Sequence, residues 1–116
     1  MMKWQNILKI NFSRNNLGFN PNKNFLEEAA SKLQELESRY WPTMMNNKPN
    51  YYREQVENGK WGAEDLLDIV EISINGFKRM HGKKRFGDLE LQIRLDYYEP
   101  LQEQLEHWRK LERDNQ

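Results

Sequence analysis

The sequence of 116 residues contains no cysteine, only two histidines and no glycine-rich phosphate-binding motif. Without cysteine there can be no disulfide, no thiolate metal site and no thiol nucleophile. His81 and His107 have no second histidine or cysteine at the spacing of metal ligands, so we expect no zinc site. The four serines lack the glycines that flank a nucleophilic serine at a strained turn. We therefore predict no catalytic residue, no metal ion and no cofactor.

Long apolar stretches are also missing from the sequence. The first residues do not form the apolar run of a signal peptide, and no segment has the length needed to span a bilayer. Apolar residues make up 37% and charged residues 31%, which predicts a thin core under a strongly solvated surface. Basic and acidic side chains are equal in number, so no net charge attracts nucleic acid or a membrane over a distance. We expect a cytoplasmic protein that does not bind membranes and forms a single domain, residues 1–116.

Helical periodicity dominates three parts of the chain, where apolar residues recur every three or four positions. These parts are residues 24–40, 63–81 and 88–113. The last contains a heptad-like seam from Leu91 to Leu111 that continues through Pro100. A proline inside a helix removes one backbone hydrogen bond and bends the helix. The sequence thus predicts an all-α, small helical bundle of three to four helices, the last one kinked near Pro100.

Two shorter segments, residues 7–12 and 89–97, show the strict alternation of apolar and polar residues that is typical of strands. An α+β fold with short strands there is the alternative prediction. For residues 89–97 the longer helical seam favours a helix. Residues 1–23 are rich in asparagine and contain Gly18 and Pro21, so we interpret them as an irregular N-terminal arm. Asn24 and Glu27 form a capping-box pattern that predicts the start of the first helix.

Residues 41–62 form a connector that is rich in aromatic, methionine and asparagine residues. Within it, a short helix from Tyr51 to Asn58 that ends at Gly59 fits the pattern. Large rigid rings supply much of the contact area at protein interfaces, although the same rings can also fill a core. The candidate binding residues of this aromatic surface are Trp41, Tyr51, Tyr52 and Trp61.

The sharpest chemical feature is a cluster of five lysines and arginines within eight residues, far from any acidic residue on its N-terminal side. The members of this basic cluster are Lys78, Arg79, Lys83, Lys84 and Arg85. Such cations can contact phosphates, with His81 or Phe86 stacking on a base, or can attract an acidic protein surface. A third interpretation is a solvated helix end, where the helix dipole favours positive charge.

The segment Glu-Asp-Leu-Leu-Asp-Ile at residues 64–69 resembles the acidic helix of the all-α nucleoside triphosphate pyrophosphatases. The resemblance implies that Glu64, Asp68 and Glu71 hold a divalent cation for nucleotide hydrolysis. The paired Glu-x-x-Glu of that family is missing from residues 25–40. The alternative is that these three carboxylates form the solvated face of a helix.

Together these patterns favour a non-catalytic protein that binds another protein, as a small interaction or regulatory module. A second hypothesis is a nucleic-acid-binding accessory protein that uses residues 78–85, and a third is the metal-dependent nucleotide hydrolase. The seam at residues 91–111 predicts burial within the chain, with a homodimer formed through the seam as the alternative. A short, asparagine-rich chain without a motif is also typical of proteins encoded by phages and mobile elements.

Overall fold

The computed structural model describes residues 21–42 and 50–114, with side chains from Asn24 onward. In these ranges the protein is all-α, as predicted, with four helices and no strand. The helices are α2 (Pro21–Tyr40), α3 (Tyr51–Glu57), α4 (Ala63–Gly82) and α5 (Asp88–Asp114). None of these four helices combines the length and the apolar character needed to cross a bilayer. The chain divides into two compact units, residues 1–60 and 61–116, and each is described by itself.

The helix ends correct some of the predicted boundaries. Helix α2 begins at Pro21 and not at Asn24, because proline in the first helical turn already has the helical φ angle and needs no hydrogen bond from its nitrogen. Asn24 therefore lies inside the helix and does not cap it. The strand alternative for residues 89–97 is wrong, since they lie within α5. Residues 7–12 lie outside the described residues.

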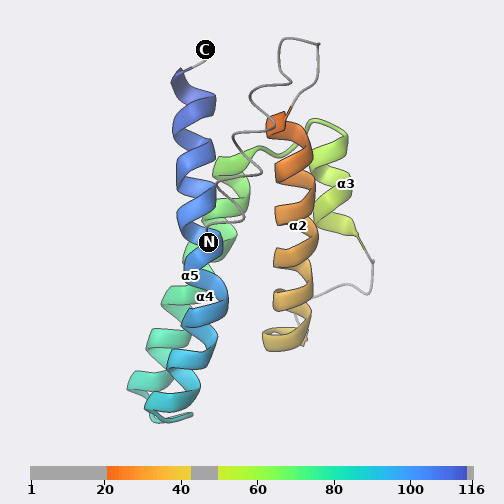
Figure 1. Cartoon of the computed structure of the whole chain (residues 1–116). Helices are drawn as coiled ribbons and strands as arrows, with labels where there is room; N and C mark the ends of the chain where they lie inside the picture. The colour runs from red at the N-terminus through yellow and green to blue at the C-terminus, as the bar shows by residue number, and fades with distance from the viewer. Residues whose placement is uncertain (1–20, 43–49, 115–116) are drawn as a thin grey trace. The chain divides into compact units, whose positions relative to one another are not determined.

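In the first unit, α2 and α3 lie side by side and run in opposite directions (Figure 1). The buried apolar side chains of this unit come mainly from one stripe of α2, as the periodicity predicted, and Val56 is the one from α3. They are Phe25, Leu26, Ala29, Ala30, Leu33, Leu36 and Val56. Because α3 has only seven residues, it depends on packing against α2 for its stability.

Both ends of α3 are fixed by specific hydrogen bonds. At its start, the backbone N–H of Tyr52 donates to the side-chain oxygen of Gln34 on α2, at 2.8 Å. This bond satisfies one of the early helical N–H groups that has no partner within the helix. At its end, Gly59 has a φ of 75°, and the N–H of Lys60 donates to the carbonyl of Gln55 at 2.9 Å. The predicted stop at Gly59 is confirmed, since glycine adopts this left-handed conformation without steric cost.

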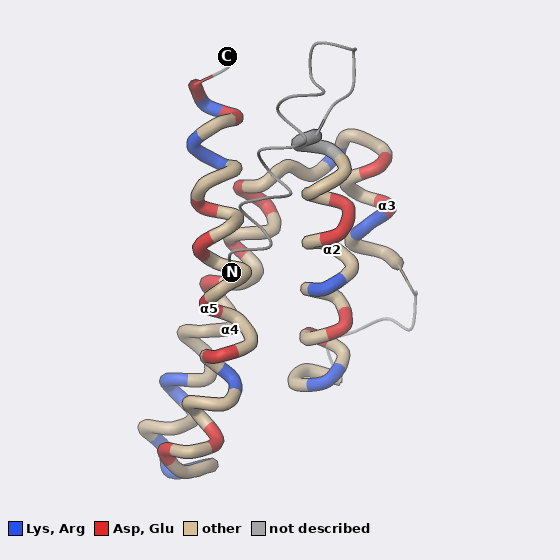
Figure 2. The backbone as a smooth tube through the Cα atoms, in the orientation of Figure 1, with Lys and Arg blue, Asp and Glu red and all other residues tan. Residues whose placement is uncertain are grey.

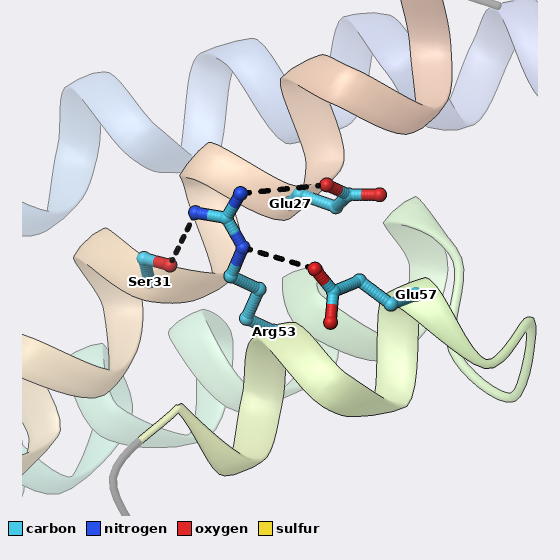
Figure 3. Close-up of polar contacts among 4 residues, drawn as sticks. All are labelled: Glu27, Ser31, Arg53 and Glu57. Atoms are coloured by element: carbon cyan, nitrogen blue, oxygen red, sulfur yellow. Dashed lines mark hydrogen bonds and ion pairs between the residues drawn. The ribbon is translucent and has the colours of Figure 1, made fainter.

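Arg53 of α3 makes three polar contacts, two of which join it to α2 (Figure 3). Its guanidinium lies 3.5 Å from the carboxylate of Glu27, 3.5 Å from the hydroxyl of Ser31 and 3.3 Å from the carboxylate of Glu57. Glu27 and Ser31 lie one turn apart on α2, so the planar guanidinium reaches both while it also pairs within its own helix.

In the second unit, α4 and α5 form an antiparallel pair of long helices (Figure 1). The largest buried side chains are aromatic, and the rings of Phe77 and Tyr98 meet edge to face with 5.1 Å between their centroids. The buried apolar residues of this unit are Ala63, Leu66, Leu67, Val70, Ile74, Phe77, Tyr98, Leu101, Leu105 and Trp108. The Asn75-Gly76 pair, which is also a hairpin signal, lies within α4.

The heptad-like seam of α5 is largely buried. Tyr98, Leu101, Leu105 and Trp108 are at most 7% exposed, so these four side chains are not available to a second copy. Helix α5 continues through Pro100, as the length of the seam indicated. The kink at this proline stays a prediction.

At the opposite end from the α4–α5 turn, side chains of α5 hold the start of α4. Both carboxylate oxygens of Glu112 lie 3.2 Å from the backbone nitrogen of Ala63, which donates to them. The carboxylate of Asp65 accepts a hydrogen bond from the N–H of Gly62 at 2.9 Å. Arg113 pairs with Glu64 at 3.0 Å. These contacts give hydrogen-bond acceptors to backbone N–H groups at the start of α4 and hold together the end of the helical hairpin opposite the turn.

Candidate binding surface at the α4–α5 turn

The turn between α4 and α5 has a defined backbone conformation. The N–H of Arg85 donates to the carbonyl of Met80 at 3.0 Å, and the N–H of Lys84 donates to the carbonyl of His81 at 2.9 Å. This pair of bonds is the Schellman motif, which needs a left-handed residue just after the helix. That residue is Lys84, with a φ of 60°, although glycines stand nearby at positions 82 and 87.

All five members of the basic cluster are exposed at this turn and at the last turns of α4. Among the residues that the structure describes, no carboxylate forms an ion pair with any of them. Figure 2 shows lysines and arginines in blue near the end of the second unit where α4 runs into α5. Positive charge at this position is favoured by the C-terminal end of α4, and these side chains are open to solvent.

Arg94, a sixth cation close in sequence, contacts side chains of its own unit. Its guanidinium lies 4.2 Å from the centroid of the Phe86 ring and 5.1 Å from that of Phe77, and its Nε donates to Glu90 at 2.9 Å. Stacking of arginine on aromatic faces is favourable and orders both partners. Arg94 thereby anchors the turn residue Phe86 against the two helices.

His81 also contributes to the turn. Its Nε2 lies 2.6 Å from the carboxylate of Asp88, the first residue of α5, so this contact spans the two helix ends. Next to it is an open hollow of about 560 Å³ that is lined by His81, Gly82, Lys84, Phe86, Gly87 and Asp88. The guanidinium of Arg94 covers one face of the Phe86 ring, whereas the contact of His81 with Asp88 runs through a ring nitrogen in the plane of the imidazole and covers neither of its faces.

Next to the turn, the first half of α5 exposes a row of large apolar side chains. Leu89 is 76% exposed, Ile93 39% and Tyr97 44%, and their i, i+4 spacing places them along one face of the helix. We call these three residues the apolar row. In the sequence these residues belong to the alternating pattern of residues 89–97. They differ from the buried seam residues, such as Tyr98 and Leu105, in their positions around the helix axis.

Two acidic residues follow the apolar row along α5. Glu99 and Glu103 are exposed, and neither forms an ion pair with a described cation. The third nearby acid, Asp96, accepts a hydrogen bond from Gln92 at 2.8 Å. The basic turn, the apolar row and these two glutamates, the acidic stretch, thus follow one another along the axis of α5, with Glu99 and Glu103 rotated about 120° and about 80° around the helix from Ile93.

The four candidates of the aromatic surface lie in both units. Trp41, Tyr51 and Tyr52 belong to the first unit, where the two tyrosine rings are 6.2 Å apart, and Trp61 belongs to the second. Trp41, Tyr52 and Trp61 are partly buried, whereas Tyr51 is exposed. Burial, with the nearby carboxylate of Glu37, raises the pKa of Tyr52 to about 12. These environments favour a structural role for Tyr52 over an open contact surface.

The acidic residues of the suggested pyrophosphatase helix do not gather into a metal site. Glu64 and Asp68 are exposed on α4, and Glu64 pairs with Arg113 at 3.0 Å. In the described part of the chain, no group of three His, Asp or Glu side chains is arranged to hold a metal ion. The three carboxylates thus share a helix face without forming a coordination sphere.

Comparison of the chain with protein-family models, with curated proteins and with solved structures finds no match. What the surface around the α4–α5 turn binds has to be inferred from its own chemistry. That surface consists of the exposed basic cluster and the apolar row, on a turn fixed by Arg94 and Lys84.

Proposed function

We propose that this chain is a non-catalytic protein-binding module whose contact surface is the basic turn together with the apolar row. The observation that carries the proposal is the exposure of Leu89, Ile93 and Tyr97 along one face of α5. Single exposed apolar residues are common, but a row of three beside a charged rim is the composition of a protein interface.

The basic cluster gives such an interface its charge. Cations at the rim of an apolar contact accelerate the encounter with an acidic surface and exclude partners of the same charge. Lys84 supports this role, because a lysine at a left-handed position costs stability that a glycine would not. Strain kept at an exposed position is typical of residues selected for binding rather than for folding.

Nucleic-acid binding is the second candidate, and the five unpaired cations favour it. Phosphate contacts require only exposed positive charge, and the basic cluster supplies that. The apolar row, however, has no role in contacts to a phosphate backbone, and one face of the Phe86 ring is already covered by Arg94. A protein partner accounts for both the charged and the apolar parts of the surface.

A photo-crosslinking experiment tests the proposal directly. Since the chain has no cysteine, Ile93→Cys provides one unique thiol at the centre of the apolar row for a benzophenone label. Ile72→Cys is the matched control, because Ile72 is also a helical isoleucine and is 69% exposed, on α4. We expect covalent protein adducts from position 93, and few from position 72, when the purified, labelled full chain is irradiated in a cell extract.

Equal adduct yields at the two positions, or none at position 93, would contradict the proposal. In parallel, the binding of labelled single- and double-stranded oligonucleotides is measured by fluorescence anisotropy across a salt series. Binding that falls linearly with the logarithm of the salt concentration, and that is lost when Lys83, Lys84 and Arg85 are changed to glutamate, would favour nucleic acid instead.

A further inference from the structure

The charges around the apolar row identify a partner. We infer that the protein bound at this surface is a second copy of the same chain, with the first halves of the two α5 helices packed antiparallel about Ile93. This inference rests on the proposed function and names the partner of the same surface. It uses a different face of α5 from the buried seam, which the sequence had suggested as a dimer interface.

The apolar row is symmetric about its central residue. Leu89 and Tyr97 lie four residues before and after Ile93, roughly 6 Å along the helix axis in each direction. In an antiparallel pair related by a twofold axis at Ile93, Leu89 of each copy therefore faces Tyr97 of the other, and the two Ile93 side chains meet. Such a surface is complementary to itself, which is the requirement for a closed, isologous dimer.

The charges beyond the two ends of the row differ in sign: apart from Asp88, which contacts His81, the N-terminal end carries the cations of the turn and the C-terminal end carries Glu99 and Glu103. Toward the C-terminus, Glu99 and Glu103 lie roughly 9 and 15 Å from Ile93. Toward the N-terminus, α5 begins roughly 7.5 Å from Ile93, and the cations at positions 83–85 lie a few residues beyond. An antiparallel pair thus brings the basic turn of one copy to the acidic stretch of the other, twice.

The same charges argue against the competing arrangement. A parallel pair would place turn against turn and Glu99 against Glu99, so each contact would join charges of equal sign. Within the described chain, neither the cations at positions 83–85 nor the two glutamates have an ion-pair partner. The second copy supplies the missing partner for both groups at once.

The size of the surface sets the strength of the dimer. Three apolar side chains per copy with charged ends form a contact at the small end of the specific interfaces, so we expect a Kd on the order of micromolar. Sedimentation velocity of the full chain across concentrations from about 1 µM to about 1 mM therefore covers the monomer and the dimer. A chain that remains monomeric throughout this range overturns the inference.

Charge introduced at the twofold axis is the first test of the geometry. Ile93→Glu places two like charges against each other, so we expect it to weaken the dimer at least tenfold, about 1.4 kcal/mol or more. Ile72→Glu makes the same change at an exposed position on α4 and should leave the Kd unchanged. Circular dichroism checks that both variants keep the helical content of the wild type. Equal effects of the two substitutions would contradict the inference.

A charge swap tests the antiparallel register itself. We expect a variant with Lys83 and Lys84 both changed to glutamate to weaken the dimer, and likewise one with Glu99 and Glu103 both changed to lysine. The chain that combines the four substitutions restores opposite charges at each end and should recover most of the affinity. If the combined variant is weaker than either parent, the basic turn does not meet the acidic stretch and the register is wrong.

Oxidation of the cysteine variant separates this inference from the proposed function. Two helices whose axes are 8–10 Å apart bring residues on the twofold axis within disulfide range, so Ile93→Cys should form a disulfide-linked dimer and Ile72→Cys should not. If position 93 forms neither this disulfide nor a self-adduct, but crosslinks in the cell extract to a different protein, the second-copy inference fails and the proposed function stands. If position 93 crosslinks to nothing, both fail.

Discussion

The carboxylate of Glu112, near the end of α5, accepts hydrogen bonds from the backbone N–H of Ala63, the first residue of α4. The two residues lie 49 positions apart, so this contact closes the end of the hairpin opposite the basic turn. It also gives a partner to an N–H group that the helix itself cannot bond. A cap supplied from another helix links the formation of α4 to its packing against α5.

Removal of this cap should destabilise the second unit. We expect Glu112→Ala to lower the free energy of unfolding by about 1 kcal/mol, the usual cost of losing a helix cap. Urea unfolding followed by circular dichroism measures the change. Glu112→Gln keeps a side-chain oxygen as acceptor and should lose less than half as much. A loss that is equal in the two variants would mean that charge, and not the hydrogen bond, is what stabilises the helix start.

The same carboxylate should give the unit a measurable dependence on pH. Burial, together with Asp65 and Glu64 nearby, raises the pKa of Glu112 above its ordinary value of 4.5, although the N–H of Ala63 opposes this shift. A raised pKa in the folded state means that folding favours the protonated acid. The stabilising contribution is therefore complete below pH 4.5 and is lost as the pH rises through the folded-state pKa.

We accordingly expect the stability of the wild type, relative to Glu112→Gln, to increase as the pH is lowered from 7 to about 4. The comparison with glutamine cancels the titration of all other carboxylates, which both proteins share. Urea unfolding at each pH measures the difference. A difference that stays constant or falls with decreasing pH would show that the pKa of Glu112 is not raised in the folded protein.

Arg53 should control the local stability of α3. Its removal in Arg53→Ala breaks the contacts to Glu27, Ser31 and Glu57, and we expect a cost of about 1 kcal/mol, since partly exposed ion pairs contribute little individually. Amide hydrogen exchange in α3 should become about fivefold faster. Arg53→Lys should restore only part of the protection, because an ammonium group cannot reach three acceptors as a planar guanidinium does.

Arg39→Ala is the matched control for this measurement. Arg39 forms an i, i+4 pair with Glu35 at 3.8 Å on the exposed side of α2, and we expect its loss to leave exchange in α3 unchanged within about twofold. Faster exchange in α3 of similar size in the two variants would mean that Arg53 acts through general electrostatics and not through the bridge between α2 and α3.

The helices of this protein could be predicted because its core depends on regular periodicity. The stripe from Leu26 to Leu36 and the seam through Leu105 keep one phase over many residues, so they identified α2 and α5. The apolar row could not be recognised in the same way. Leu89, Ile93 and Tyr97 alternate with the seam residues, and only the packing of α4 against α5 decides which of the two sets is buried.

Contacts between residues far apart in the chain could not be predicted from the sequence either. Gln34 and Tyr52 are joined by a hydrogen bond from a backbone N–H, which no pattern of residue types encodes. The basic cluster was found from its composition. The contacts of Arg94 with the Phe86 ring and with the Glu90 carboxylate, however, depend on the fold of the turn. Composition thus identified the charges, and only the structure showed which of them are exposed without a partner.

The left-handed backbone of Lys84 leads to a prediction that separates stability from binding. Glycine adopts a φ of 60° freely, whereas a lysine there costs about 1–2 kcal/mol, partly offset by the greater entropy that glycine loses on folding. We expect Lys84→Gly to raise the free energy of unfolding by about 0.5–1 kcal/mol in urea unfolding. Lys83→Gly is the control, because Lys83 has an ordinary φ of −90°, and it should be destabilising.

Both substitutions remove one cation from the turn, so both should weaken binding at this surface while their effects on stability have opposite signs. This combination is expected if lysine occupies position 84 for its charge, at the expense of the stability that glycine would provide. Sedimentation velocity of the two variants at equal salt concentration measures the binding side of the comparison. If Lys84→Gly stabilises the protein and leaves its association unchanged, the charge of Lys84 does not contribute to the surface.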